Sequence, residues 1–92
     1  MKNTTEIEQE ITDLALRKIV ENVKRERKKQ KMSQLNLAMA MGHESVGLIS
    51  FIEAGINNRR YNLIHLISIA KILDISILEL FEGVDEILQT KQ

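Results

Sequence analysis

An apolar run that is interrupted by glycine constrains this chain more than any other feature. Residues 33–55 read SQLNLAMAMGHESVGLISFIEAG. Ser33 is a favourable N-cap for a helix over residues 34–41, in which Leu37, Ala38 and Met41 face inward. Gly42 then suits the left-handed conformation that follows a helix end. The first half of the stretch therefore predicts a short helix and a sharp corner.

The second half of the stretch predicts another short helix. Ser45 is placed to cap a helix over residues 46–54, and Gly55 is placed to end it. Ile49 and Ile52 are its inward pair. The two helices and the corner together have the form of a helix-turn-helix motif.

Apolar residues recur at helical spacing on both sides of this motif. The N-terminal stripe consists of Ile7, Ile11, Leu14, Ala15, Ile19 and Val23. It predicts a helix that runs to about Lys29, with a break near Leu16 as the alternative. The stripe after the motif consists of Leu63, Leu66, Ile67, Ala70 and Leu73, with Asn62 as the N-cap.

Two further segments follow. Ser76 to Glu79 has the form of a capping box, which predicts a fifth helix through Phe81. The tail at residues 83–92, with Val84, Ile87 and Leu88, either forms one more turn or frays.

Composition supports an all-α fold and excludes several function classes. The 92 residues include no proline, no cysteine and three aromatic residues. His43 and His65 are too few for a metal site, so neither a metal nor another cofactor is expected. No nucleophile–base arrangement appears, so an enzyme is not expected. Neither a membrane span nor a secretory signal is found, and we expect a cytoplasmic protein.

The net charge of zero conceals an asymmetry. Residues 17–60 carry ten basic and four acidic side chains, whereas residues 1–16 and 61–92 each have a net charge of −3. A basic middle between acidic ends fits a polyanion site on one side of the molecule. A solvated helix face with mixed charges is the alternative.

Four sequence pieces occur in the order typical of one family. They are Arg27 seven residues before Gln34, Gln34-x-x-x-Ala38-x-x-x-Gly42, Ile49-Ser50-x-x-Glu53-x-Gly55, and HLISIAKILDIS. Together they resemble the Cro/C1-type (XRE) helix-turn-helix family. The resemblance implies a five-helix lambda-repressor-like DNA-binding domain over residues 19–82, with an N-terminal helical extension over residues 1–18. The family commonly has glycine where Lys31 stands.

The resemblance also implies roles for individual residues. Arg27 and Glu53 correspond to a partly buried ion pair that ties the first helix to the end of the recognition helix. The implied DNA-binding residues are Ser33, Gln34, Ser45, Val46, Gly47, Ser50, Phe51, Asn57, Asn58, Arg59 and Arg60. The last four form the loop that grips the phosphate backbone in this family.

Helical geometry leaves alternatives at several of these positions. Gln34 either helps to hold a phosphate or is an ordinary polar residue at a helix start. With Ile49 and Ile52 inward, Phe51 faces outward, where it either contacts thymine methyl groups or a sugar of the DNA, or folds back onto a neighbour. The outward face lacks the Arg, Gln and Asn side chains that make bidentate base contacts.

Two functions remain open at this point. The first is a sequence-specific DNA-binding transcriptional regulator, a repressor that binds double-stranded DNA as a homodimer on a palindromic operator. The alternative is a protein-interaction module, such as the antitoxin that pairs with a toxin. Either a second subunit or such a partner would cover the N-terminal stripe and the tail.

Overall fold

The computed structural model describes residues 3–42 and 46–89, and these residues form helices without any strand. The predicted all-α class is therefore confirmed. In chain order the elements are α1 (Thr4–Lys29), α2 (Gln34–Ala40), α3 (Leu48–Ala54), the 3-10 turn η1 (Ile56–Asn58), α4 (Leu63–Leu73), the 3-10 helix η2 (Ile77–Phe81) and α5 (Val84–Leu88). Within these ranges no helix has the length and apolarity that crossing a membrane requires.

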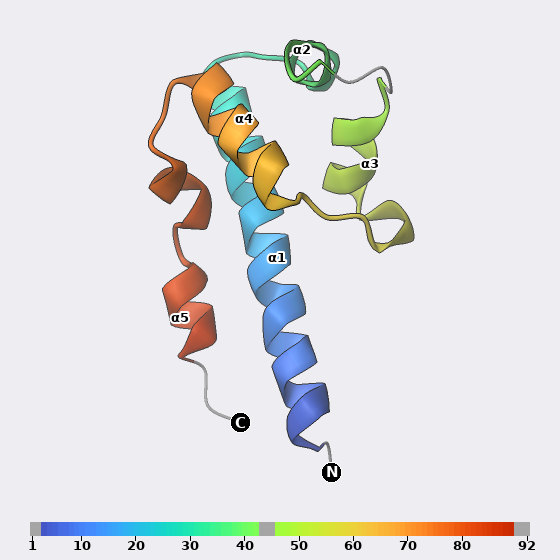
Figure 1. The fold of residues 1–92 in the computed structure, drawn as a ribbon, viewed down its shortest axis with the longest axis vertical. Coiled ribbons are helices and arrows are strands. Elements are labelled where there is room, and N and C mark those ends of the chain that lie inside the picture. Colours follow the sequence, from blue (N-terminus) through green and yellow to red (C-terminus); the bar gives the residue numbers. More distant parts are fainter. Residues whose placement is uncertain (1–2, 43–45, 90–92) are drawn as a thin grey trace.

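Helix α1 runs along the whole length of the molecule, and the other elements gather around its C-terminal two thirds (Figure 1). The side chain of Asn3 caps its start by accepting a hydrogen bond of 2.8 Å from the backbone N–H of Glu6. Three cations occupy its last turn, where the helix dipole favours positive charge. The helix is unbroken at Leu16, so a single rigid element joins the N-terminal extension to the family fold.

Helix α2 and the corner after it form as the sequence indicates. The hydroxyl of Ser33 accepts the backbone N–H of Asn36 at 2.9 Å, and Gly42 adopts φ +77°. Leu37 and Ala38 are fully buried. A buried alanine leaves room for a second helix to approach closely, and α3 packs against α2.

Helix α3 starts two residues later than the sequence predicted. Ser45, the expected N-cap, lies outside the described residues. Val46 and Gly47 form a turn, and the helix begins at Leu48 without a side-chain cap. Valine and glycine are weak helix formers, so this turn is the natural limit of α3. The predicted end is confirmed, because Gly55 has φ +72°.

Helix α4 has a capping box in which Asn62 and His65 each bond the other's backbone N–H. Its buried face differs from the predicted stripe. Ile69 is fully buried, whereas Leu63 and Ile67 are 62% and 55% exposed. The helix is apolar on more than one face, so periodicity alone could not identify the side that meets α1 and η2.

The fifth helix was predicted as α-helical, but η2 is a 3-10 helix. The hydroxyl of Ser76 accepts the backbone N–H of Leu78 at 3.2 Å, two residues ahead, rather than that of Glu79. The predicted capping box between Ser76 and Glu79 is therefore replaced by a tighter cap at Leu78. The carbonyls of Glu79, Leu80 and Glu82, at the C-terminal end of η2, are bound by side chains from α1.

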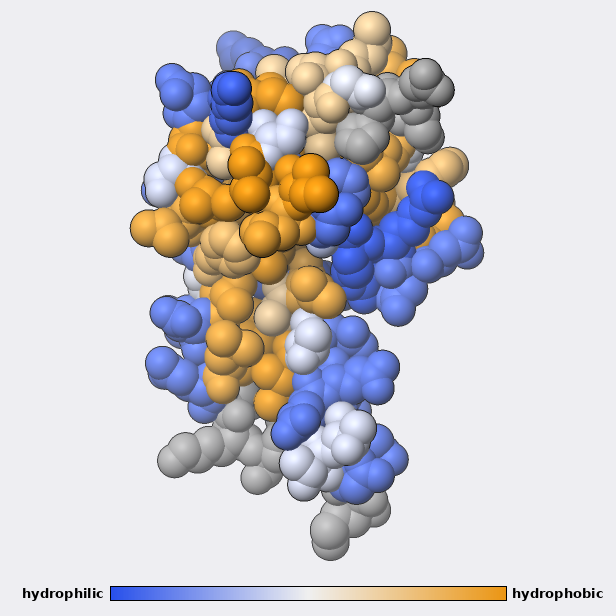
Figure 2. Space-filling view, viewed as in Figure 1, coloured by the Kyte–Doolittle hydropathy of each residue, from blue (hydrophilic) through white to orange (hydrophobic). Residues whose placement is uncertain are grey.

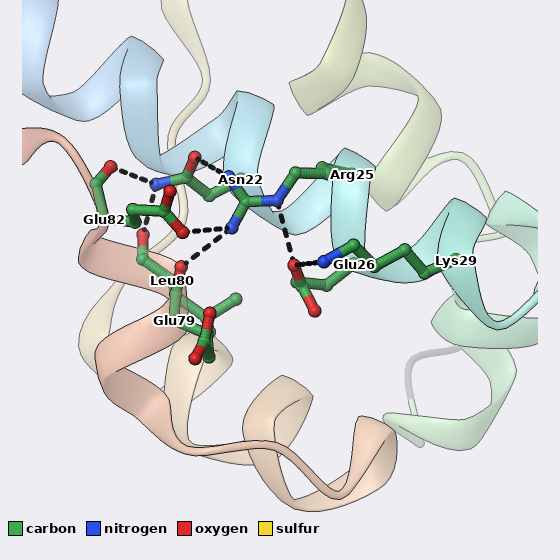
Figure 3. Close-up of polar contacts among 7 residues, drawn as sticks. All are labelled: Asn22, Arg25, Glu26, Lys29, Glu79, Leu80 and Glu82. Atoms are coloured by element: carbon green, nitrogen blue, oxygen red, sulfur yellow. Dashed lines mark hydrogen bonds and ion pairs between the residues drawn. The ribbon is translucent and has the colours of Figure 1, made fainter.

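These contacts centre on Asn22, whose side chain is almost completely buried. Its amide donates to the carbonyls of Leu80 and Glu82 at 3.0 and 2.8 Å (Figure 3). Arg25 adds bonds to the carbonyl of Glu79 and to the carboxylate of Glu82, each at 3.2 Å. We call Asn22 and Arg25 with these three partners the C-terminal clamp.

Arg25 also bonds a buried carboxylate. Its Nε donates to Glu26 Oε2 at 2.9 Å, and Lys29 lies 3.1 Å from the same oxygen. The hydrogen bond from Arg25 lowers the pKa of Glu26, and Lys29 acts in the same direction against the opposing effect of burial. The clamp therefore holds the chain after α4 against residues 22–25 of α1, and Glu26 helps to position the Arg25 side chain.

Helix α5 lies alongside α1 and covers part of the N-terminal stripe (Figure 1). Val84 packs against the core, while Ile7 and Ile11 are half-buried and Leu14 is 54% exposed. The predicted need for a second subunit here is thus met in part by the chain's own tail.

We expect Asn22→Ala to lower the free energy of unfolding by about 1–3 kcal/mol, because it leaves the buried Leu80 carbonyl and the part-buried Glu82 carbonyl without this donor. The measurement is the midpoint and slope of urea denaturation. Asn36→Ala is the control, since that side chain is exposed and should change stability by less than about 0.5 kcal/mol. Equal midpoints for the two variants would contradict the role of the clamp.

Candidate nucleic-acid interface

A buried ion pair joins α1 to the end of α3. Arg27 Nε and Nη2 donate to the two carboxylate oxygens of Glu53 at 3.0 and 2.9 Å. The two side chains are only 8% and 3% exposed. This bidentate geometry is the strongest that an arginine and a carboxylate form, and burial reduces the screening by water.

Two further bonds extend the pair to the intervening chain. Arg27 Nη1 donates to the carbonyl of Met32 at 2.8 Å, and Gln34 Nε2 donates to Glu53 Oε1 at 2.8 Å. We call Arg27, Gln34 and Glu53 the core triad. The Gln34 amide nitrogen, which sequence reasoning considered for a phosphate, is thus directed toward Glu53.

The chain between α1 and α2 turns at Lys31, which adopts φ +56°. Glycine adopts this left-handed conformation without strain and other residues are strained in it, which fits the glycine that the resemblance implied at this position. The turn delivers the Met32 carbonyl to Arg27. Lys31 itself is exposed, so its side chain meets no obstacle.

Helix α3 turns Ile49 and Ile52 inward and presents Phe51 and Ala54 to solvent. Ser50 is half-buried, and its hydroxyl donates to the carbonyl of Gly47 at 3.0 Å. Gly47 itself is half-buried rather than an open contact point. A Cβ at Gly47 would lie 3.0 Å from the Phe51 ring, so glycine leaves room for the ring beside the turn that precedes α3.

The Phe51 ring also supports a cation from the following loop. The guanidinium carbon of Arg59 lies 5.6 Å from the ring centroid, which is within the range of a cation–π contact. Phe51 nevertheless keeps 42% of its surface exposed. The ring thus touches neighbours within the chain and still offers exposed surface, and its contact with DNA stays a prediction.

The loop that follows α3 has an unusual backbone. Gly55, Asn57 and Asn58 all have positive φ, at 72°, 54° and 58°. Asparagine tolerates the left-handed conformation better than most residues, which explains the pair of asparagines. Both asparagine side chains are exposed, beside Arg59.

Arg60 and Tyr61 differ from their exposed neighbours. Arg60 is half-buried, its Nη1 donates to the Arg59 carbonyl at 3.2 Å, and its Nε is buried without a protein partner. Tyr61 belongs to the core, although the sequence placed it in a polar loop, and burial raises the pKa of its hydroxyl. An isolated aromatic residue between polar ones was the only signal for it.

The candidate residues thus fall into two groups. Those on open surface are Ser33, Val46, Phe51, Asn57, Asn58 and Arg59. Gln34, Gly47, Ser50 and Arg60 are half-buried and engaged within the chain, and Ser45 is not described. Among the described residues no cluster of metal-ligating side chains is present.

We expect Glu53→Ala to lower the free energy of unfolding by about 3–5 kcal/mol, because it leaves Arg27 as a buried charge without its partner. Glu79→Ala, which removes an exposed carboxylate, should cost no more than about 0–1 kcal/mol. Urea denaturation of both variants is the measurement. A Glu53→Ala midpoint equal to that of the wild type would show that the triad does not hold α1 and α3 together.

A comparison with models of protein families supports the resemblance that the sequence pieces indicated. A helix-turn-helix family model matches residues 23–80, which include the core triad, both motif helices, the loop after α3, α4 and most of η2. Comparisons with curated proteins and with solved structures gave no significant match. The match covers well over half of the chain, and its order of elements is the one described above. The chain therefore belongs to the Cro/C1-type (XRE) helix-turn-helix family of DNA-binding transcription regulators.

Proposed function

We propose that the protein is a sequence-specific repressor that binds a palindromic operator as a homodimer. The observation that carries this proposal is the pairing of an exposed recognition face on α3 with a cation fixed beside it, Arg59 over Phe51. The core triad supports it, because a helix that reads base edges must be held at a fixed angle. A repressor of this size acts by occupying its operator.

The chemistry of α3 limits how it reads sequence. Phe51 offers an apolar surface that suits a thymine methyl group, and the Ser50 hydroxyl already donates a hydrogen bond to the Gly47 carbonyl. We therefore assign base selection mainly to Phe51 and affinity for phosphates to Arg59. Ser33 and the two loop asparagines lie on open surface and complete the proposed backbone contacts.

An uncovered apolar patch on α4 supports the homodimer. Leu63, Ile64 and Ile67 are 62%, 77% and 55% exposed on neighbouring turns. Figure 2 shows apolar side chains gathered over α4 and continuing toward α5. The exposed charges of α4 and its C-cap, Lys71 and Asp74, balance each other. A twofold contact between two such patches therefore brings no excess of like charge together.

Phe51→Ala should weaken operator binding by about 1–3 kcal/mol while leaving binding to scrambled DNA nearly unchanged, because it removes a base contact and no charge. Arg59→Ala should weaken binding to both DNAs and reduce the slope of log K against log salt by about one, because one phosphate contact is lost. The measurement is a salt titration of each variant on both DNAs. Equal losses for Phe51→Ala on the two DNAs would show that Phe51 does not select bases.

Ile64→Glu should convert the dimer to a monomer at micromolar concentration, because it places two carboxylates within one apolar contact. Its side chain is 77% exposed in the single chain, so the fold should persist, as circular dichroism would verify. Leu14→Glu tests the other candidate surface, at the far end of α1. Sedimentation showing dimers of Ile64→Glu and monomers of Leu14→Glu would move the interface to the N-terminal stripe.

A further inference from the structure

A small pocket lies between α1 and the loop that follows α3, with a volume of about 180 Å³. Ligand pockets for drug-sized molecules usually measure roughly 300–1,000 Å³, so this one suits a small group. Val20 and Ile52 contribute apolar wall. Three cations also line it, Arg17 and Lys24 from α1 and Arg60 from the loop.

The charges of the pocket do not balance. Arg17, Glu21 and Lys24 succeed each other at steps of four and three, which places them on one face of α1. Among the described residues no ion pair engages Arg17, Lys24 or Arg60. Two acidic residues line the pocket, Glu21 and Glu53. Glu53 is already paired with Arg27, so only the Glu21 carboxylate offsets the three cations. Three cations and one free carboxylate leave a local charge of +2.

Arg60, which lines the pocket, has one buried donor without a partner in the protein. Arg60 Nε has no hydrogen-bond acceptor, and Arg60 uses only Nη1, on the carbonyl of Arg59. A buried guanidinium donor without an acceptor is costly unless a bound group satisfies it. Guanidinium groups match the geometry of phosphate oxygens, and a phosphomonoester carries a charge near −2 at neutral pH.

We propose that this pocket binds a phosphate group, held by Arg17, Lys24 and Arg60. The source is either a small phosphomonoester or a phosphate of the DNA backbone. A small phosphomonoester would engage Arg60 directly beside Arg59, and so couple ligand binding to the DNA-binding loop. Arg17 lies outside the residues that match the family, so this site depends on the chain's own N-terminal extension.

The first experiment uses the full chain without DNA, so its outcome is independent of the proposed function. Inorganic phosphate and glycerol 3-phosphate are titrated at constant ionic strength, and the arginine Nε–H signals are followed by NMR. We expect saturable shifts in the signals of Arg17 and Arg60.

Arg17→Gln should weaken binding roughly tenfold, because it removes a charge-assisted hydrogen bond. Glu21→Gln should strengthen binding, because it removes the opposing carboxylate.

Lys71→Gln is the matched control, since it removes one cation from α4 and does not line the pocket. If Arg17→Gln and Lys71→Gln weaken phosphate binding equally, the effect belongs to the general field and the small-ligand site is refuted.

The second experiment separates the two sources of phosphate. The DNA-binding salt slopes of Arg17→Gln and Lys71→Gln are compared. A slope reduced by about one in Arg17→Gln alone assigns the pocket to the DNA backbone. An unchanged slope together with saturable binding of the free phosphates assigns it to a small ligand. If the free phosphates do not bind saturably and the slope is also unchanged, the proposal is overturned.

Discussion

The arrangement of the helix-turn-helix depends on one buried charge pair. Arg27 and Glu53 join α1 to the C-terminal end of α3, and the Gln34 amide adds α2 to the same carboxylate. Burying two charges removes their hydration, so such a pair adds less to stability than its Coulomb energy suggests. Its geometry is nevertheless demanding, because one arginine must satisfy Glu53 and the Met32 carbonyl together. Three helices and a turn are thereby held in a single relative orientation.

Helix α1 is the scaffold for both ends of the chain. Arg27 binds Glu53 of the helix-turn-helix motif, and Asn22 and Arg25 bind backbone carbonyls of η2. Because α1 continues without a break through Leu16, the extension outside the family match is rigidly attached to the DNA-binding half. Residues of the extension, such as Arg17, can therefore reach the loop that follows α3.

The proposed recognition surface has few hydrogen-bonding groups on α3 itself. Its exposed features are an aromatic ring and an alanine, with an arginine leaning on the ring. Such a surface favours apolar contacts with thymine methyl groups, and leaves a larger share of specificity to the shape and flexibility of the DNA. The cation–π contact matters in this setting, because it limits the positions that the Arg59 side chain adopts near the backbone.

Much of this protein was determined by its sequence, because local signals decide local structure. Ser33, Gly42, Gly55 and Asn62 set helix ends through their own backbone and side-chain chemistry. The spacing of Arg27, Gln34 and Glu53 in the sequence is enough to point to the family. The fold class and the position of the motif therefore followed from the sequence.

Other features were decided only when distant segments met. Asn22 binds carbonyls 58 and 60 residues away, and these bonds accompany a 3-10 helix where local chemistry predicted an α-helix. The buried face of α4 was decided by what packs against it, since Ile64, Ile67 and Ile69 are equally apolar. The same holds for Gln34, whose amide turned to Glu53, and for Phe51, which meets Arg59. In each case several local choices cost nearly the same free energy, so contacts between distant segments made the decision.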